Sequence, residues 1–334
     1  MIMINKTLSF LFLLLTLISV NRAAFALQSS DYKQLNTLFK QVASKTDYTV
    51  PQLEELFKNV EIKPRIIEAM DRPAESTMTW TRYSKIFLTE KNISKGTEFW
   101  RLHENTLARA EKDYGVPAEI IVATLGVETR YGTNTGNFRV IDALSTLALE
   151  YPRRSKYFLA ELKNFLLLTD EHKLDPLAVT GSYAGAIGLP QFMPSSYRSY
   201  AVDFSNSGYS DLVNNFEDAI GSIASYSNKQ GWTPGQPVSW SVDSVSKQGS
   251  NLVVKKRKTD RSLDALLKAG VVVQETGSPD SRVGLIKLTG DQGPEYRVAF
   301  DNFFVITRYN TSRMYATAVQ LLGEQIKSRV QTAR

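Results

Sequence analysis

The sequence predicts an α+β protein that is mainly helical, with one small β insertion late in the chain. From about residue 30 to residue 114, apolar residues recur at three- and four-residue spacing and glycines are few, a period typical of amphipathic helices. Between residues 232 and 288, short runs rich in valine are separated by turn residues, which is typical of strands. A last stretch, 303–327, returns to the helical period.

The N-terminal segment has the layout of a secretory signal peptide. Lys6 supplies a positive n-region, Leu8 to Val20 form an almost uninterrupted apolar run, and Ala24-Phe25-Ala26 gives the small-x-small cleavage pattern. The run is shorter than the roughly 20 apolar residues that a membrane span needs. We expect cleavage after Ala26, and the alternative is an uncleaved N-terminal anchor.

Composition excludes several kinds of chemistry. The 334 residues include no cysteine and two histidines, His103 and His172. Thiol catalysis, cysteine metal sites and a lipid-modified cysteine are therefore excluded, and a Ser-His-Asp triad or a histidine zinc site is not expected. The net charge of +6 suits an anionic polymer but is too small to indicate nucleic acid. Catalysis is expected to depend on carboxylates, in a soluble, exported, periplasmic monomer.

Glycine and proline divide the helical part. Gly115 fits the residue just past a helix end, and Pro117 opens the next helix. Segment 176–215 is rich in Gly, Ser, Pro and Asn and is expected to form loops around short helices. The other expected helices are 117–131, 143–150, 155–168 and 216–230, and the expected strands are 238–242, 252–254, 271–273 and 283–288.

These elements suggest a division of the chain into regions. The signal peptide is followed by a helical domain and by a core that carries the two motifs described next, and a small β domain interrupts that core. The predicted boundaries are 1–26 for the signal peptide, 27–114 with the C-terminal helix 311–334 for the helical domain, 115–231 with 289–310 for the core, and 232–288 for the β domain.

A carboxylate lies on the apolar face of the helix predicted at 117–131. Ile121, Leu125 and Glu128 follow one another at helical spacing, so Glu128 shares a stripe that is otherwise apolar. Burial and the negative end of the helix dipole both favour the protonated acid, which a general acid needs in order to protonate a leaving oxygen near neutral pH. From this helix alone, a structural carboxylate paired with an arginine is the better interpretation.

A glycine-rich motif follows at 181–197, with the sequence Gly-Ser-Tyr-Ala-Gly-Ala-Ile-Gly-Leu-Pro-Gln-Phe-Met-Pro-Ser-Ser-Tyr. It lacks the Gly-Lys-Ser/Thr ending and the preceding strand of a phosphate loop. Together with Gly-Val-Glu-Thr-Arg-Tyr-Gly at 126–132, it resembles the lytic transglycosylases, and more narrowly the family of membrane-bound lytic transglycosylase B. The resemblance extends over roughly residues 30–327 and implies a lysozyme-like core.

The resemblance also implies an activity and a site. The activity is cleavage of the β-1,4 bond between N-acetylmuramic acid and N-acetylglucosamine in peptidoglycan, leaving 1,6-anhydro-N-acetylmuramic acid ends, with Glu128 as the acid/base. The substrate-binding residues that it implies are Arg153, Arg154, Ser182, Gln191, Tyr226, Tyr309, Asn310 and Tyr315. Aromatic rings can bind sugar faces and arginines can hold carboxylates. Taken singly, the tyrosines could be core residues and the arginine pair a solvated surface.

One family feature is degenerate in this chain. Relatives can carry a calcium loop that resembles an EF-hand, and residues 203–209 occupy its place. Asp203 and Gly208 fit that pattern, but Ser207 stands where an acidic or amide ligand is usual, and Asn214 stands where the bidentate Glu would fall. We therefore expect no tight metal site and no cofactor.

Neither motif contains a second acid, although a distant residue could supply one. The absence fits a reaction in which the muramic C6 hydroxyl, rather than a water activated by a second carboxylate, attacks C1. The alternatives are a lysozyme-type muramidase on the same fold and a non-catalytic peptidoglycan-binding protein. The expected partners are peptidoglycan glycan strands, with other cell-wall enzymes as further candidates, and no nucleic acid.

Overall fold

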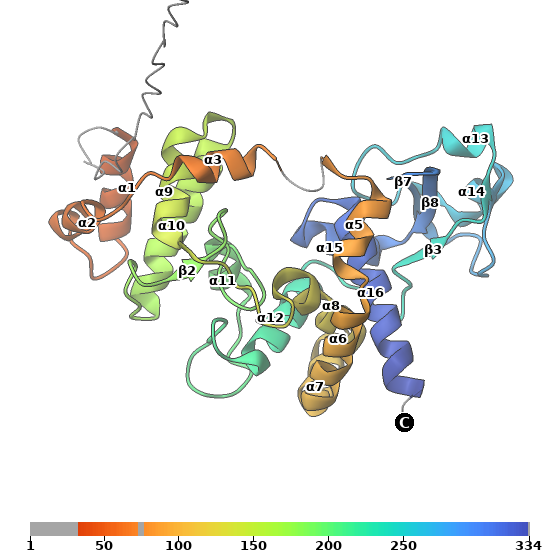
Figure 1. Ribbon diagram of the computed structural model, residues 1–334, viewed down its shortest axis with the longest axis horizontal. Coiled ribbons are helices and arrows are strands. Elements are labelled where there is room, and N and C mark those ends of the chain that lie inside the picture. Colours follow the sequence, from red (N-terminus) through yellow and green to blue (C-terminus); the bar gives the residue numbers. More distant parts are fainter. Residues whose placement is uncertain (1–32, 73–76, 333–334) are drawn as a thin grey trace, which may run out of the picture.

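The computed structural model describes residues 33–72 and 77–332. Helices make up most of this part of the chain, and a small sheet lies at one end of the long axis (Figure 1). The helices α1, α2, α3, α9 and α10 gather at the opposite end, and α6, α7 and α8 lie between the two. The expected class, mainly helical with a small β part, is confirmed.

The first helical lobe joins segments that are far apart in the sequence. Its N-terminal helices are α1 (Lys33–Ala43), α2 (Val50–Phe57) and α3 (Pro64–Met70), and they pack on α9 (Val140–Glu150) and α10 (Ser155–Glu171). A capping box between Thr49 and Gln52 starts α2. The Phe39 and Phe57 rings meet edge-on with centroids 4.7 Å apart in the core of this lobe.

The second lobe surrounds one central helix, α8 (Ala118–Thr129). Around it pack α6 (Glu90–Leu102), α7 (Glu104–Tyr114), α12 (Phe216–Lys229), α15 (Asp301–Tyr309) and α16 (Arg313–Thr332). The helix α5 (Trp80–Phe87) packs on α16 and on β7 (Arg282–Gly290). Because α8 is enclosed, it is apolar on nearly every side rather than along one stripe. The predicted break before it is confirmed, since Gly115 ends α7 with φ +70°.

The sheet has four antiparallel strands in the order β3-β8-β7-β5. They are β3 (Ser239–Ser241), β8 (Gly293–Ala299), β7 (Arg282–Gly290) and β5 (Arg261–Ser262). A second pair, β4 (Ser244–Val245) with β6 (Val271–Val272), continues from β3, accompanied by α13 (Lys247–Ser250) and α14 (Leu263–Lys268). Leu263, Leu285 and Val298 belong to the apolar core of this part.

Several predicted elements need correction. The strand predicted at 252–254 is wrong, because only Val253 forms a bridge, to Leu285. Strand β8 was not predicted, because Pro294, Glu295 and Arg297 obscure the apolar pattern of a strand. The helix predicted over 303–327 is two helices, since the chain is not helical between α15 and α16.

The glycine-rich motif is a loop, as predicted. It begins at the last residue of the short strand β2 (Thr180–Gly181), which pairs with β1 (Phe138–Arg139), and it ends within α11 (Pro194–Tyr200). Isolated bridges join Ile187 to Gly181 and to Phe192. The motif is thus folded back on itself and held against the start of α9.

The predicted signal peptide, 1–26, lies outside the described residues. Within residues 33–72 and 77–332, no helix combines the length and the apolar character that crossing a bilayer requires. The division into domains remains a prediction, although the described helices from 27–114 contribute to three apolar clusters rather than one.

Candidate active site

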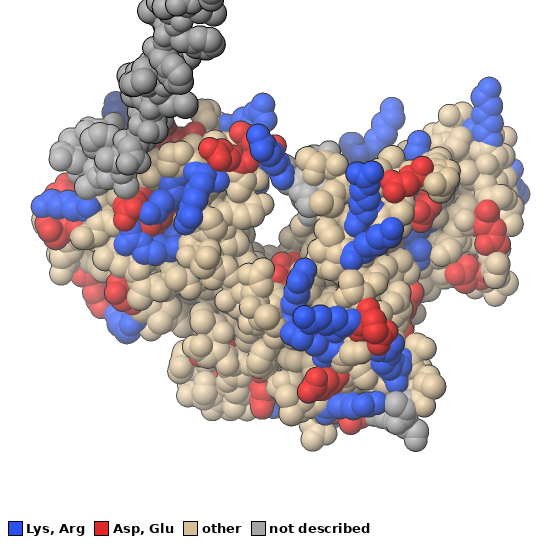
Figure 2. All heavy atoms as spheres, in the orientation of Figure 1, with Lys and Arg blue, Asp and Glu red and all other residues tan. Residues whose placement is uncertain are grey.

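A groove of about 780 Å³ lies between the two helical lobes, and the space-filling view shows the surface hollowed there (Figure 2). One wall includes Tyr151, Arg154 and Tyr183, and the other is formed by the end of β7 and the segment 310–314. Three cations, Arg154, Lys287 and Arg313, line this groove, and no Asp or Glu is among the described residues that do so. The groove therefore favours a ligand with anionic groups.

Glu128 is half-buried in the last turn of α8, and Tyr315 of α16 holds it. The Tyr315 Oη donates a hydrogen bond to Glu128 Oε1 over 2.5 Å. Burial, and next the Glu128 carboxylate, raise the pKa of Tyr315 well above its ordinary value. The phenol therefore keeps its proton and acts as a neutral donor that orients the carboxyl group. Met314, the residue before Tyr315 in the chain, lines the groove.

Three of the predicted tyrosines form a continuous row of rings that ends at Glu128. Tyr226 and Tyr309 meet edge-on with centroids 4.9 Å apart, and Tyr309 stacks on Tyr315 at 6.4 Å. Tyr226 Oη donates to the carbonyl of Arg308 over 2.7 Å, and Tyr309 Oη donates to the carbonyl of Pro190. The row thus ties α12 and α15 to the glycine-rich motif.

Ser182 and Gln191 both lie within that motif, and both stabilise its backbone. Ser182 Oγ accepts a hydrogen bond from the Ala186 amide over 3.0 Å. Gln191 Nε2 donates to the carbonyls of Thr135 (3.0 Å) and Gly188 (2.8 Å). Gln191 also lines a smaller cavity of about 120 Å³. Both side chains are therefore pre-organised by the loop that presents them.

The glycines of the motif have a packing role that the sequence analysis did not foresee. A Cβ on Gly185 would lie 2.4 Å from Leu144 Cδ2, and one on Gly188 would lie 2.2 Å from the carbonyl oxygen of Leu212. Both residues also have positive φ, +84° and +73°. The motif needs glycine here because the protein's own atoms approach so closely.

Gly126, in the other motif, has a similar role. A Cβ there would lie 2.4 Å from Tyr131 Oη, and a Cβ on Gly96 of α6 would meet the same atom at 2.4 Å. The Tyr131 ring therefore fits into a slot between two helices and stacks on Phe99 at 5.5 Å. This slot fixes the chain just after Glu128, where Arg130 and Tyr131 both adopt left-handed backbone conformations.

The remaining predicted residues lie at different distances from this cluster. Asn310 follows Tyr309 directly, accepts a hydrogen bond from the Ser312 amide over 3.0 Å and lines the groove. Arg154 also lines the groove, with its guanidinium 4.2 Å from the centroid of the Tyr157 ring. Arg153, in the 3₁₀ turn Pro152–Arg154, is exposed and does not line the groove.

The structure adds residues that the sequence analysis missed. Tyr83 of α5 is buried near Tyr315, and its electrostatic influence contributes to the raised pKa of Tyr315. Lys287 and Arg313 contribute positive charge to the groove. The sequence around Tyr83, Lys287 and Arg313 is that of ordinary helix and strand positions, so it gave no indication of their place in the site. Tyr183 also lines the groove, and its position inside the glycine-rich motif could have identified it from the sequence.

In the loop at 203–209, the loop's own backbone amides bind Asp203. Both carboxylate oxygens of Asp203 accept backbone amides, from Ser207 over 2.8 Å and from Gly208 over 2.7 Å. Burial opposes ionisation of Asp203, but these bonds outweigh it and lower its pKa. Among the described residues, no group of three or more His, Cys, Asp or Glu side chains gathers in one place. Hydrogen bonds from the loop's own backbone fix the position of the acid that would begin an EF-hand.

Chelation tests this account of the loop. Treating the purified protein with EGTA should leave its melting temperature and its lytic activity unchanged, because Asp203 is satisfied by amides rather than by a cation. Differential scanning calorimetry with and without added calcium measures the first quantity. A drop of several degrees that calcium reverses would show that the loop binds the ion after all.

Comparison with known proteins places this geometry in a family. The transglycosylase SLT domain matches residues 30–324. The membrane-bound lytic murein transglycosylase B of Escherichia coli (strain K12) is 39% identical over 294 residues, which cover 85% of this chain and 80% of that protein. The catenated lytic transglycosylase SltB1 of Pseudomonas aeruginosa superposes with a TM-score of 0.83 at 44% identity, covering 90% of this chain and 98% of that one.

A more distant structure carries a ligand. SltB3 of Pseudomonas aeruginosa, solved in complex with NAG-anhNAM-pentapeptide, superposes with a TM-score of 0.74 at 28% identity. The match covers 87% of this chain and 78% of SltB3. The chain described here therefore belongs to the family of transglycosylases with an SLT domain.

Proposed function

We propose that this protein is a lytic transglycosylase that cleaves the β-1,4 bond between N-acetylmuramic acid and N-acetylglucosamine in peptidoglycan and leaves 1,6-anhydro-N-acetylmuramic acid ends. The observation that carries the proposal is the half-buried Glu128, oriented by the neutral phenol of Tyr315. The adjoining groove has no acidic lining residue in the part of the chain that the structure describes.

Glu128 performs both proton transfers in this proposal. As the acid, it protonates the glycosidic oxygen while the bond from that oxygen to C1 of the muramic residue breaks. As the resulting carboxylate, it takes the proton of the muramic C6 hydroxyl while O6 forms the new bond to C1. The proton count balances, no water is consumed, and Glu128 ends in its starting state.

The two sequence motifs support an internal nucleophile. Two-carboxylate glycosidases use a second Asp or Glu across the bond, as nucleophile or as base for water, and neither the 126–132 motif nor the 181–197 motif contains an acid besides Glu128. An attacking hydroxyl within the same sugar gains the advantage of proximity over bulk water. The anhydro-muramic ligand solved in SltB3 is the kind of product that this reaction forms.

Positions around Glu128 suggest how the strand is held. Asn310 and Arg154 line opposite walls of the groove, where an amide can bind sugar hydroxyls and a guanidinium can bind the lactyl or peptide carboxylates. Tyr226 and Tyr309, with Ser182 and Gln191, complete the proposed sugar-binding set next to the groove. Arg153 is exposed and does not line the groove, so only the family resemblance supports a role for it in substrate binding.

Product mass tests the reaction type. Digestion of purified glycan strands should release muropeptides that are about 18 mass units lighter than hydrolysed ones, since hydrolysis would add one water. Mass spectrometry after chromatographic separation measures the difference. Strands whose muramic C6 hydroxyl is O-acetylated should resist cleavage, because their nucleophile is blocked. Mainly reducing muramic ends, or equal cleavage of O-acetylated strands, would identify a muramidase.

We further propose that the protein is exported to the periplasm through the N-terminal signal peptide and carries no lipid anchor. Its cysteine-free sequence offers no site for lipid attachment. The mature protein should begin at Leu27 and should appear in the soluble periplasmic fraction, as N-terminal sequencing after fractionation will show. A membrane-bound form that retains Lys6 would support the anchored alternative.

A further inference from the structure

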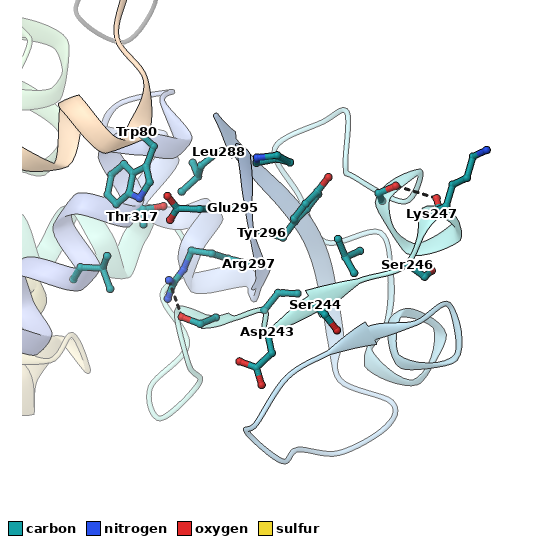
Figure 3. A pocket seen from close by; sticks show the side chains of 16 residues that line it. Trp80, Asp243, Ser244, Ser246, Lys247, Leu288, Glu295, Tyr296, Arg297 and Thr317 are labelled. Carbon is teal, nitrogen blue, oxygen red and sulfur yellow. Dashed lines mark hydrogen bonds between the residues drawn. The ribbon is translucent and has the colours of Figure 1, made fainter. Parts of the chain in front are cut away.

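A second pocket, of about 570 Å³, lies behind one wall of the groove. It opens where α5 and α16 meet the β7–β8 hairpin and the segment 241–250 (Figure 3). Leu288 lines both cavities and belongs to a small apolar cluster with Trp80, Tyr83 and Ala318. A thin apolar wall therefore separates this rear pocket from the groove.

A buried arginine that forms no direct ion pair marks the rear pocket. The Arg297 side chain lines it and is 8% exposed, yet none of the described carboxylates lies within ion-pairing distance of this guanidinium. Its hydrogen bonds run to neutral oxygens, from Nε to Ser239 Oγ over 2.7 Å and from Nη1 to Ser241 Oγ over 3.1 Å. A buried charge is costly unless an opposite charge compensates it.

The guanidinium is nevertheless held firmly in place. Ser239 Oγ accepts from Arg297 and donates in turn to Gln320 Oε1 over 2.5 Å, and Gln320 Nε2 donates to Ser239 O and to Glu324 Oε1, each over 2.8 Å. This network orients Arg297 through the neutral side chains of Ser239 and Gln320 and ends at the Glu324 carboxylate. Its charge is therefore pre-organised but not neutralised by a direct contact, as an anion-binding arginine requires.

An acid stands next to this arginine on the same face of β8. Residues two apart on a strand share a face, and Glu295 and Arg297 project to the side of β8 on which Trp80 and Thr317 lie (Figure 3). Both line the rear pocket, and Glu295 acts on Arg297 electrostatically without a direct ion pair. Arg297 and Glu295 thus place opposite charges side by side, with an indole ring nearby, and Lys247 and Asp243 also line the pocket.

We propose that the rear pocket binds a zwitterionic amino-acid end, with its carboxylate on Arg297 and its ammonium on Glu295. Glu295 would repel a simple anion such as phosphate, whereas a carboxylate and an ammonium group on the same carbon complement the charges of Arg297 and Glu295. This inference rests on the proposed function for its source of ligand, because the stem peptides of peptidoglycan can present such a group at the end of a diamino-acid side chain. The site would give the enzyme a second hold on the wall outside the groove.

Calorimetric titration of the whole protein with a synthetic stem tripeptide tests the proposal. The probe ends in diaminopimelate, whose side chain carries one carboxylate and one ammonium group. The first comparison peptide has lysine in place of diaminopimelate and so lacks the side-chain carboxylate. The second has diaminopimelate acetylated on its side-chain nitrogen and so lacks the side-chain ammonium. Each comparison peptide should bind about tenfold more weakly or worse, since each loses a charge-assisted hydrogen bond. The indole resonance of Trp80 should shift on binding. Equal binding of the three peptides, or none, would overturn the inference.

Variants locate the site. Arg297→Met should weaken binding of the diaminopimelate peptide about tenfold or more, and Arg282→Met, at an exposed position of the neighbouring strand β7, should not change it. If Arg297→Met does not fold, Glu295→Gln provides the test, because Glu295 is exposed. This variant should bind the peptide with the free side-chain amine no more tightly than the acetylated peptide. Loss of binding in Arg154→Met, with Glu295→Gln unaffected, would assign the peptide to the groove and overturn the inference. The titrations measure binding and require no catalysis. If digestion of glycan strands gave hydrolytic products, the proposed function would be overturned, but the measured affinities of the peptides would not change.

Discussion

Glu128→Gln is expected to lower lytic activity by about a hundredfold or more, because general acid–base catalysis is worth at least that much and an amide can neither give nor take the proton. The fold should survive, since the amide oxygen can still accept the hydrogen bond from Tyr315 Oη that Glu128 Oε1 now accepts. Turbidity loss of a peptidoglycan suspension measures the activity, and circular dichroism with the melting temperature measures the fold.

Tyr315→Phe is the matched comparison. It removes the donor that orients the carboxyl group but leaves the acid itself, so the loss should be smaller, about tenfold for one hydrogen bond to a charged group. A correctly folded Glu128→Gln enzyme that kept a tenth of wild-type activity would exclude Glu128 as the acid/base. The proton would then have to come from another group.

Gly188→Ala is expected to destabilise the protein by about 3 kcal/mol, the sum of a backbone penalty and a steric clash. The residue has φ +73°, and its new Cβ would lie 2.2 Å from a backbone oxygen, that of Leu212. A backbone atom cannot rotate away as a side-chain end can. The amide of Leu189 also donates to this oxygen over 2.7 Å, so the motif and the segment before α12 would have to separate. Urea unfolding measures the loss.

Gly208→Ala separates the two contributions. Gly208 has φ +102°, and a Cβ at this position would have no atom of the described residues within 4 Å. An alanine there should therefore cost only the backbone penalty, about 1 kcal/mol. Equal effects of the two substitutions would mean that the motif relaxes around the added methyl group. The close approach to Leu212 would then not explain why the motif has glycine at position 188.

The parts of the fold that were predicted correctly depend on local sequence patterns. The break at Gly115 and the enclosed helix that carries Glu128 depend on neighbouring residues, so composition and period revealed them, and the glycine-rich motif identified the family. Other features have weak local signals. Strand β8 carries Pro294 and Arg297, and its place in the sheet depends on pairing with β7 and β3.

The sequence by itself determined a mainly helical fold, an acid on an apolar helix and a family whose motifs name the candidate residues. Tertiary structure decided which groups meet: Tyr315 reaches Glu128 across 187 residues of chain, and residues from both lobes line one groove. It also left Arg153 outside that groove and placed Arg297 beside Glu295 in a separate pocket. The physical reason is the distance along the sequence over which each feature is determined. Helical period and turn residues depend on neighbours within a few positions, whereas the contacts that assemble a site form only when distant segments pack together.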